Sequence, residues 1–359
     1  MSFPLYLLGH SLSLLALYGF WSGGLSSFLL PFVVFGLVPI LELFMTPKAE
    51  NLSNEKLDEL NETSWYNNLV LAVIPLQYMT LLIYLWFVRY GSWTIFEWIG
   101  CTLSMGILCG LYGINAAHEL GHRSDRFSKW GAKALLLTSL YMHFFIEHNR
   151  GHHAKVATED DPASSRLNET LYTFWYRSVR GSFLSAWRIE TRRLERKSLS
   201  PWSWQNQALR FIVIQLSFLF ILWFIFGNVG ILSFVCVATL GFSLLEAVNY
   251  IEHYGLQRQK NSKGRYEPVT PAHSWNADYP ISRILLFELS RHADHHAHPR
   301  RGYAQLRHFS ESYQLPTGYP GMILLALVPF IYIPTMNNQI HLEAKRVAST
   351  MQEGVFPNA

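Results

Sequence analysis

Nine histidines occur in four short clusters of this chain, and their spacing suits metal binding. Histidines four residues apart, such as His118 and His122, project from one face of a helix and can share an ion. Nine imidazoles exceed the number that one ion can coordinate, so the clusters predict two metal ions. The candidate ligands are His118, His122, His148, His152, His153, His253, His292, His295 and His296.

The histidine clusters alone do not identify the metal. Imidazole binds zinc, copper, iron and nickel, and the Glu-x-x-His pairs of soluble di-iron bundles are not the pattern found here. Three cysteines, Cys101, Cys109 and Cys236, lie in apolar runs and form no CxxC pair. They therefore predict buried thiols rather than a zinc knuckle or an iron–sulfur site.

Several side chains near the clusters are candidates for orienting the metal ligands. A metal-bound histidine usually donates its second N–H group to a carboxylate or a carbonyl oxygen. Asn249 lies about one helical turn before His253 and can orient that ring. His273 is a further candidate, for which a structural role is the competing interpretation. The carboxylate candidates, each of which can also be read as an ordinary surface charge, are Glu119, Glu147, Asp161, Glu252 and Asp294.

The elements that position these clusters are predicted to be membrane helices. Half of the residues are apolar and only 15% are charged, well below the roughly 25% of an average soluble domain. A bilayer core about 30 Å thick requires about 20 apolar residues in a helix. The six candidate spans cover residues 3–20, 25–44, 67–88, 94–115, 209–226 and 229–250.

The distribution of basic residues predicts the orientation of these spans. The short turns at residues 21–24, 89–92 and 227–228 contain only Arg89, so 28 of the 29 Lys and Arg residues lie in the remaining segments. Since cytoplasmic segments are enriched in basic residues, these remaining segments and both termini are predicted to be cytoplasmic. The mild net charge of +4 gives no reason to expect a nucleic-acid partner.

The predicted fold is an all-α integral membrane protein, a six-transmembrane-helix bundle with a cytoplasmic, histidine-rich catalytic cap. Residues 116–208 and 251–359 form the cap, and the whole chain, 1–359, forms one domain. Two shorter apolar runs, Gly131–Ile146 and Gly321–Pro334, are expected to lie at the membrane interface without crossing it. The acidic segment Met45–Tyr66 is interpreted as a solvated connection.

Seven stretches of the chain, most of them containing histidine, carry a family resemblance: His118–His122, Glu147–His153, Thr158–Arg166, Asn249–Leu256, Val269–Asn276, Arg291–His296 and Leu315–Leu327. They closely resemble the bacterial alkane 1-monooxygenase (alkane ω-hydroxylase) family of the membrane desaturase–hydroxylase superfamily. The Asn-Tyr-x-Glu-His-Tyr-Gly stretch in particular separates this family from lipid desaturases. One departure is visible, because the family usually has Gln and Ser at the positions of Ser290 and Ala293; the ligand positions are retained.

This resemblance implies a non-haem centre of two iron ions, held by the nine histidines, with O2 as the oxidant. It also implies hydroxylation of the terminal methyl group of alkanes at the cytoplasmic side of the bacterial inner membrane. The implied electron donor is rubredoxin, which an NAD(P)H-dependent flavin reductase reduces. Since the chain lacks the cysteines of a fused rubredoxin, the donor is expected to be a separate protein.

Other functions are compatible with parts of the pattern. A xylene-type methyl hydroxylase or a lipid desaturase shares the histidine clusters and the fold. The stretch His118–His122 also satisfies the H-E-x-x-H motif of zinc proteases, but such an enzyme gives the other clusters no role. A metal transporter requires ligands near the bilayer midplane, whereas these clusters follow the predicted helix ends.

A basic stretch, Arg177–Lys197, contains seven Lys or Arg residues against two glutamates. One interpretation is a docking surface for an acidic electron carrier, which charge would steer. The other is the basic bias of a cytoplasmic segment beside anionic lipid. The sequence favours neither.

Overall fold

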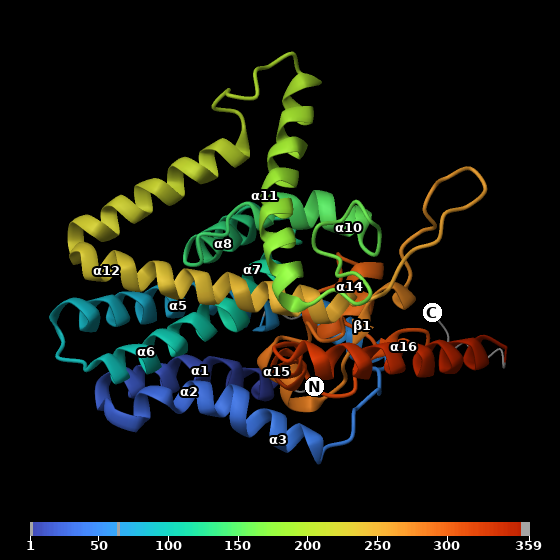
Figure 1. Cartoon of the computed structure of the whole chain (residues 1–359), viewed down its shortest axis with the longest axis horizontal. Coiled ribbons are helices and arrows are strands. Elements are labelled where there is room, and N and C mark those ends of the chain that lie inside the picture. The colour runs from blue at the N-terminus through green and yellow to red at the C-terminus, as the bar shows by residue number, and fades with distance from the viewer. Residues whose placement is uncertain (1–2, 63–64, 353–359) are drawn as a thin grey trace. The chain divides into compact units, whose positions relative to one another are not determined.

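The computed structural model describes residues 3–62 and 65–352, which are mostly helical (Figure 1). These residues form two compact units, each assembled from separate segments of the chain. The first unit contains residues 3–36, 65–151 and 180–245. The second contains residues 37–62, 152–179 and 246–352.

The first unit is built from helices, among which α1, α5 and α6 pack against one another (Figure 1). Two of its helices, α11 and α12, continue into residues of the second unit. The elements are α1 (Phe3–Ser22), η1 (Gly24–Phe28), α2 (Leu29–Phe32), η2 (Val33–Leu37), α5 (Trp65–Tyr90), α6 (Ile95–Ile107), η3 (Leu108–Ile114), α7 (Asn115–Gly121), α8 (Arg126–Leu137), α9 (Phe144–Glu147), η4 (His148–His152), α11 (Leu171–Glu195) and α12 (Gln207–His253).

The second unit combines short helices and the 24-residue helix α16 with one pair of parallel strands. In that pair, Trp275 and Asn276 lie opposite Tyr313 and Gln314. The elements are α3 (Val38–Leu43), α4 (Asn54–Glu62), α10 (His153–Lys155), η5 (Pro271–His273), β1 (Trp275–Asn276), α13 (Pro280–Leu285), α14 (His292–Ala297), η6 (Tyr303–Gln305), β2 (Tyr313–Gln314), α15 (Tyr319–Ala326) and α16 (Pro329–Gln352).

Four helical segments within the described residues are long and apolar enough to cross a membrane, so the chain is a membrane protein. They contain five of the six predicted spans, because the last segment holds both the fifth and the sixth. The remaining predicted span, residues 3–20, is helical as α1 but is not among the four. The four segments are Gly24–Leu43, Trp65–Tyr90, Ile95–Gly121 and Gln207–His253.

Helix α12 is too long to be one membrane span. Its 47 residues would extend about 70 Å at 1.5 Å per residue, more than twice the thickness of a bilayer core of about 30 Å. Gly227 interrupts the helix with φ 68° and ψ −167°, a conformation that glycine adopts without a Cβ clash. Figure 1 shows α12 changing direction sharply, so this glycine supplies the turn predicted between the last two spans.

The helix that leads into the first histidine cluster begins with a capping box. The N–H of Glu97 donates to the Thr94 hydroxyl (3.3 Å), and the N–H of Thr94 donates to the Glu97 carboxylate (2.8 Å). Helix α6 continues through the π-helical η3 into α7, whose last turn carries His118. Gly110 permits α12 to approach closely, since a Cβ atom there would lie 2.7 Å from the carbonyl oxygen of Gly241.

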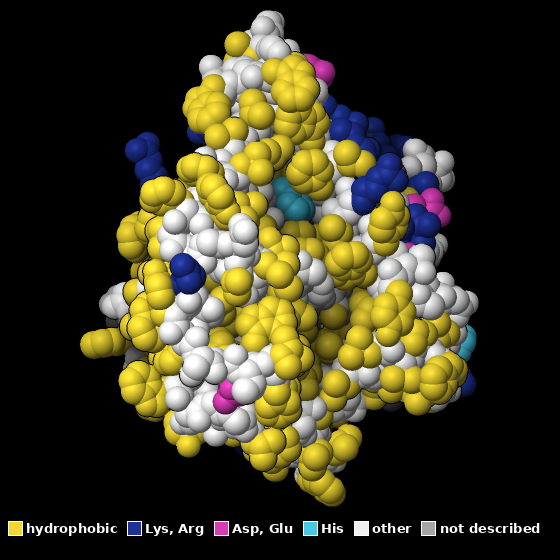
Figure 2. Space-filling view, turned by 60° about the vertical axis from the view of Figure 1, so that its left-hand side comes forward, with side chains coloured by type: hydrophobic (Ala, Val, Ile, Leu, Met, Phe, Trp, Pro, Cys, Tyr) yellow, Lys and Arg dark blue, Asp and Glu magenta, His cyan; other side chains and the backbone are white. Residues whose placement is uncertain are grey.

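The exterior of the membrane helices is apolar. Figure 2 shows hydrophobic side chains over most of the face that it presents. On α12, for example, Leu216, Phe220, Phe224 and Leu232 are all more than 60% exposed. An exposed apolar surface of this kind is stable where lipid covers it.

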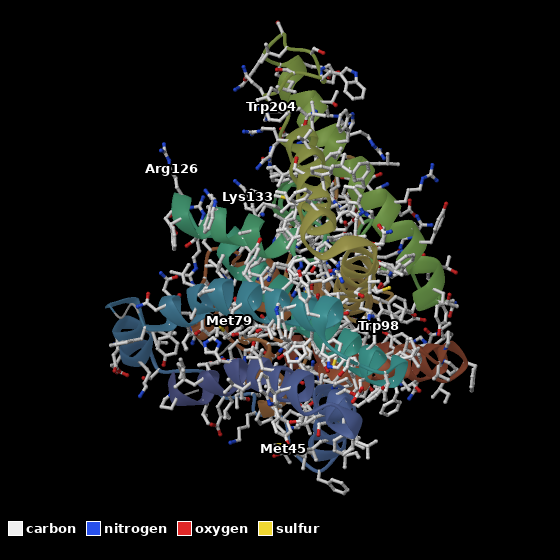
Figure 3. All side chains as sticks on the ribbon, turned by 90° about the vertical axis from the view of Figure 1, so that its left-hand side faces the viewer. Met45, Met79, Trp98, Arg126, Lys133 and Trp204 are labelled. Carbon is white, nitrogen blue, oxygen red and sulfur yellow. The ribbon has the colours of Figure 1, made fainter. Side chains whose placement is uncertain are left out.

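Neither of the two shorter apolar runs forms a single long helix, as expected for segments that do not cross. Helix α8 ends at Leu137, and Leu140 then adopts a positive φ of 51°. Figure 3 shows Arg126 and Lys133 on α8, so this helix also carries charge. The second run is divided between α15 and α16, and Asn54–Glu62 of the predicted solvated connection is helical.

A buried carboxylate joins α11 to the start of α12 within the first unit. Glu190 is fully buried and accepts hydrogen bonds from Arg150, Arg193 and the backbone N–H of Gln207, each at 2.8 Å. Burial alone would raise the pKa of Glu190. The three hydrogen bonds outweigh burial and hold this pKa below its usual value.

We expect Glu190→Gln to lower the Tm of the detergent-solubilised protein at pH 7, by the loss of about 1–3 kcal/mol from hydrogen bonds to a charged group. A carboxylate whose pKa is depressed by folding contributes stability above its unfolded pKa of 4.5. That contribution is lost as the pH falls through the folded-state pKa. The Tm difference from wild type should therefore shrink between pH 7 and pH values below about 4.

Scanning fluorimetry at several pH values measures this difference. Glu195→Gln changes an exposed carboxylate of the same helix and serves as the control. A Tm difference for the Glu190 variant that is equally large at all pH values would contradict the prediction.

Candidate metal centre

Four histidines of the second unit converge on one small volume. His152 lies at the end of η4, His253 at the end of α12, and His292 and His296 on α14. One ligand-capable atom of each ring lies within 4.8 Å of those of the other three, and all four residues are buried. The Nε2 atom of His296 is 2.9 Å from that of His292 and 3.2 Å from that of His152.

The chemistry of this four-histidine group fits a bound cation. The Nδ1 atom of His152 lies 2.8 Å from a carboxylate oxygen of Asp161, so Nδ1 carries the proton and Nε2 presents a lone pair. Burial and the neighbouring imidazoles hold the pKa of His296 well below its usual value. Neutral imidazoles with converging nitrogen atoms are ligands for iron, zinc or copper.

Three further candidate ligands lie together in the first unit. The ring of His118 is 5.0 Å from that of His122 and 4.5 Å from that of His148, measured between centroids. The Nε2 atoms of His122 and His148 are 3.1 Å apart. In the second unit, the Nε2 atoms of His153 and His295 are also 3.1 Å apart. All nine predicted ligands therefore face at least one other through a ring nitrogen or a ring edge.

Spacing alone did not predict how these histidines are grouped. His148 and His152 are four residues apart, the separation that suggested a shared ion. In the structure they begin and end the π-helical η4, and His148 contacts His122 whereas His152 contacts His296. The pair His292 and His296, also four residues apart, does belong to one group.

Asp161 contacts the four-histidine group through Nδ1 of His152, the ring nitrogen that does not face His296. The Asp161 carboxylate is buried and accepts from His152 Nδ1 and, at 2.6 Å, from the hydroxyl of Ser164. Burial alone would raise the pKa of Asp161, but these contacts hold it below its usual value. The aspartate therefore fixes both the tautomer and the orientation of the ring, as predicted for a residue of this kind.

Glu252 lies next to Nε2 of His292, a ring nitrogen that faces the other histidines, whereas Asp161 contacts the opposite nitrogen, Nδ1, of His152. One oxygen of Glu252 is 3.2 Å from Nε2 of His292, and the other accepts a 2.8 Å hydrogen bond from the hydroxyl of Tyr319. Both Glu252 and Tyr319 are buried. Sequence reasoning proposed Glu252 as an orienting carboxylate but did not single out Tyr319, although Tyr319 lies within one of the family-like stretches.

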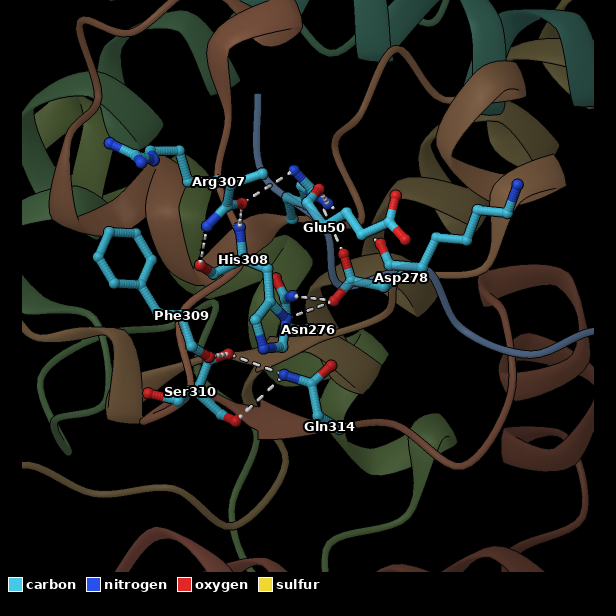
Figure 4. A network of polar contacts seen from close by, with 12 residues as sticks. Glu50, Asn276, Asp278, Arg307, His308, Phe309, Ser310 and Gln314 are labelled. Atoms are coloured by element: carbon cyan, nitrogen blue, oxygen red, sulfur yellow. Dashed lines mark hydrogen bonds and ion pairs between the residues drawn. The ribbon is translucent and has the colours of Figure 1, made fainter. Parts of the chain in front are cut away.

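Helix α14, which carries three candidate ligands, is held at its start by a buried ion pair. Arg291 donates to Asp278 at 2.9 Å and to the backbone carbonyls of Glu50 (2.9 Å) and Leu306 (2.8 Å). Figure 4 shows the continuation of this network, in which His308 and Asp278 interact at 2.7 Å. The arginine therefore connects the segment after α3 to the start of α14.

Asp294, in the first turn of α14, connects this helix to the residues that follow it. Its carboxylate accepts from His298 (2.7 Å), Arg301 (2.8 Å) and the backbone N–H of Arg307 (2.7 Å). None of these partners is a predicted metal ligand. Asp294 thus stabilises the helix that carries the ligands.

We expect Arg291→Met to lower the Tm strongly, because it removes the guanidinium that pairs with the buried Asp278 and leaves this carboxylate to His308 and Asn276. Breaking a buried ion pair in this way costs about 3–5 kcal/mol. Scanning fluorimetry of the detergent-solubilised protein measures the change. Arg300→Met removes an exposed arginine and should leave the Tm nearly unchanged; equal effects of the two substitutions would refute the prediction.

The other proposed orienting residues have different surroundings. Glu119 forms an ion pair with Arg123 at 2.8 Å, and Glu147 accepts from Ser185 at 3.2 Å. Asn249 is buried in α12, one turn before His253. His273 accepts from the N–H of Thr270 at 2.9 Å and caps η5, which agrees with the structural interpretation of this residue.

Comparison with known proteins adds independent information. The fatty acid desaturase family model matches residues 92–324. The chain is 40% identical over 306 residues to alkane 1-monooxygenase 1 of Alcanivorax borkumensis, an alignment that covers 85% of this chain and 76% of that protein. It is also 40% identical over 308 residues to the alkane 1-monooxygenase of Pseudomonas putida, covering 86% and 76% of the two chains.

A more distant similarity involves a different substrate. The xylene/toluene monooxygenase hydroxylase component of Pseudomonas putida is 28% identical to this chain over 230 residues, which cover 64% of this chain and 61% of that protein.

Proposed function

Because this chain belongs to the alkane 1-monooxygenase family, within the fatty acid desaturase family, we propose that it is a membrane monooxygenase that hydroxylates the terminal methyl group of alkanes with O2. The observation that carries this proposal is the buried four-histidine group in a chain so similar to these enzymes. The similarity extends over 85% of the chain, and the matched residues 92–324 of the fatty acid desaturase family include all four histidine clusters.

We propose that the nine histidines hold two iron ions. His152, His253, His292 and His296, which converge within the second unit, would hold one of them. The bound irons would supply the redox chemistry that activates O2. Asp161 keeps the His152 ring in the tautomer that presents Nε2, and Tyr319 holds the Glu252 carboxylate beside His292.

The protein must also select one methyl group of a substrate that has no polar group to which side chains could bind. Selectivity then depends on position, which a narrow apolar channel between the membrane helices would provide by admitting the end of the chain first. The aromatic-rich spans can line such a channel. Burial of the four-histidine group also excludes water, which protects a reactive oxidant from unproductive decay.

In this proposal both units act together as one hydroxylase domain with six transmembrane helices. The bacterial inner membrane is the location, with both termini and the metal centre on the cytoplasmic side. The distribution of Lys and Arg between the short turns and the other segments supports that orientation. We further propose that the electrons come from a separate rubredoxin, reduced by an NAD(P)H-dependent reductase.

The alternatives are a methyl hydroxylase of the xylene type and a lipid desaturase. The xylene/toluene enzyme is only 28% identical, whereas two alkane 1-monooxygenases are 40% identical over a longer part of the chain. This difference favours the alkane as substrate.

Product analysis tests the proposal. The iron-loaded protein in nanodiscs, supplied with rubredoxin and its reductase under ¹⁸O2, is offered octane, p-xylene and stearoyl-CoA in separate reactions. Octan-1-ol that contains one ¹⁸O atom is the expected main product. Formation of a double bond in the acyl chain, or faster oxidation of p-xylene than of octane, would contradict the proposal.

A further inference from the structure

A surface pocket of the second unit lies close to the four-histidine group. Its volume is about 390 Å³, and its lining comes from two segments of the chain, residues 157–167 and 256–257. The N–H of Gly255 donates to the carbonyl of Ser165 at 3.2 Å and joins these segments. The pocket does not coincide with any residue that is predicted to bind metal.

Two hydrogen bonds connect this pocket to a candidate metal ligand. Ser164, which lines the pocket, donates to Asp161 at 2.6 Å. The same carboxylate oxygen of Asp161 accepts from Nδ1 of His152 at 2.8 Å. The path from the surface to the His152 ring is therefore short and contains only bonded or hydrogen-bonded atoms.

A hairpin anchored beside the pocket carries most of the local positive charge. Lys260 and Tyr266 form an antiparallel bridge, and the Lys260 ammonium lies 4.8 Å from the centre of the Tyr266 ring. At the base of the hairpin, Arg258 donates its backbone N–H to the carbonyl of Ala157 (2.8 Å) and its guanidinium to that of Ala154 (3.1 Å).

We define a basic rim as the six Lys and Arg residues of residues 155–167 and 256–267: Lys155, Arg166, Arg258, Lys260, Lys263 and Arg265. The acidic residues of the same segments are Glu159, Asp160, Asp161 and Glu267, so the local balance is six positive against four negative charges, and Asp161 is buried. Glu267 is already engaged by His273 (3.2 Å) and by the N–H of Gln259 (2.8 Å). The rim thus presents a net positive surface.

The proposed reaction requires a partner that supplies electrons. Hydroxylation breaks one C–H bond and the O–O bond, places one oxygen atom in the alcohol and releases the other as water. The balance is RH + O2 + 2 H⁺ + 2 e⁻ → ROH + H2O, so a one-electron carrier must dock twice in each turnover. We propose that the basic rim docks an acidic one-electron carrier protein and that electrons pass from the pocket toward His152; this inference rests on the proposed function.

The basic part of α11 in the first unit is better suited to lipid. Arg188, Arg192 and Arg196 are exposed there, and the following loop carries Trp202 and Trp204, which are 73% and 63% exposed. Figure 3 shows Trp204 in this loop. Basic residues beside exposed tryptophan are typical of a segment at the membrane interface. Reversing the charge of these three arginines therefore serves as the control for reversing the charge of three residues of the basic rim.

The test compares two charge-reversal variants of the full-length protein in nanodiscs. The rim variant is Lys260→Glu, Lys263→Glu and Arg265→Glu, and the control variant is Arg188→Glu, Arg192→Glu and Arg196→Glu. Octan-1-ol formation is measured against the concentration of reduced rubredoxin at several ionic strengths. Reduced methyl viologen, a small cation that does not require a basic surface, replaces rubredoxin in a parallel assay.

We expect the rim variant to raise the KM for rubredoxin by about tenfold or more at low ionic strength, and to weaken its salt dependence, because charge steers the encounter. Its rate with methyl viologen should equal that of wild type, and the control variant should resemble wild type in both assays. The proposal is overturned if the control variant raises the KM as much as the rim variant does, or if the rim variant raises it less than twofold.

Failure of the proposed function gives a different result. In that case the wild-type protein forms no octan-1-ol with either electron donor. Direct binding of rubredoxin to the nanodisc-embedded protein then decides the docking proposal by itself. Loss of binding in the rim variant alone supports it, and binding that is equal in wild type and the rim variant contradicts it.

Discussion

The His296→Ala variant is expected to lose more than about 99% of its octane hydroxylation, because loss of a ligand exceeds the 10–100-fold cost of losing a residue that only supports one. His296 lies nearest the middle of the four-histidine group, with Nε2 atoms of His292 and His152 at 2.9 and 3.2 Å. Removing its ring takes away one ligand and opens a space for water. Iron content, measured by plasma mass spectrometry, should fall to about half that of the wild-type protein.

The control for this substitution is His341→Ala. His341 is an exposed histidine on α16 and belongs to none of the groups. Its variant should keep the activity and the iron content of wild type. Size-exclusion chromatography shows whether each variant remains folded. A folded His296→Ala protein that keeps both its iron and its activity would refute the assignment of this residue as a ligand.

Asp161→Asn is expected to weaken iron binding by about 10–100-fold while the fold is retained. The amide preserves the size of the side chain, but its oxygen is a weaker acceptor than a carboxylate oxygen for the N–H of His152 and the hydroxyl of Ser164, which share one oxygen of Asp161. Its nitrogen, which takes the place of the other oxygen, cannot accept from the N–H of Ala163. The ring of His152 is therefore held less firmly in its tautomer, and the chelator concentration that removes half of the iron should fall.

Asp160→Asn is the matched control, because Asp160 is the exposed neighbour of Asp161. Both variants are titrated with the same iron chelator at pH 7, and the remaining iron is measured at each concentration. The control should follow the wild-type curve. If the two variants lose iron equally, the role of Asp161 behind His152 is wrong.

Most of the membrane helices could be predicted from apolar length alone. The predicted spans 67–88 and 94–115 correspond to the helical segments Trp65–Tyr90 and Ile95–Gly121, whose ends differ from the prediction by only a few residues, apart from the extension into the first histidine cluster. The turn at Gly227 was also predicted, because one membrane span of about 20 residues cannot be as long as the 47 residues of α12. The grouping of the histidines was not predictable, because it depends on the π-helical η4 and on which segments meet in space.

The residues that support the ligands were only partly predictable. Asp161 and Glu252 were found because carboxylates near histidine clusters commonly orient ligands. Arg291 and Tyr319 were missed as supporting residues, although both lie in family-like stretches. Their partners, Asp278 and Glu252, are 13 and 67 residues away in the chain. Local spacing carries no information about contacts over such distances, whereas most buried polar side chains have a hydrogen-bond partner.

The direct test of the central claim is the metal content of the wild-type protein, purified in detergent from cells grown with both iron and zinc. Plasma mass spectrometry gives the number of each ion per chain. The nine-histidine assignment predicts about two irons and little zinc. One zinc per chain without iron would contradict the proposed di-iron centre and would favour a zinc site at His118–His122.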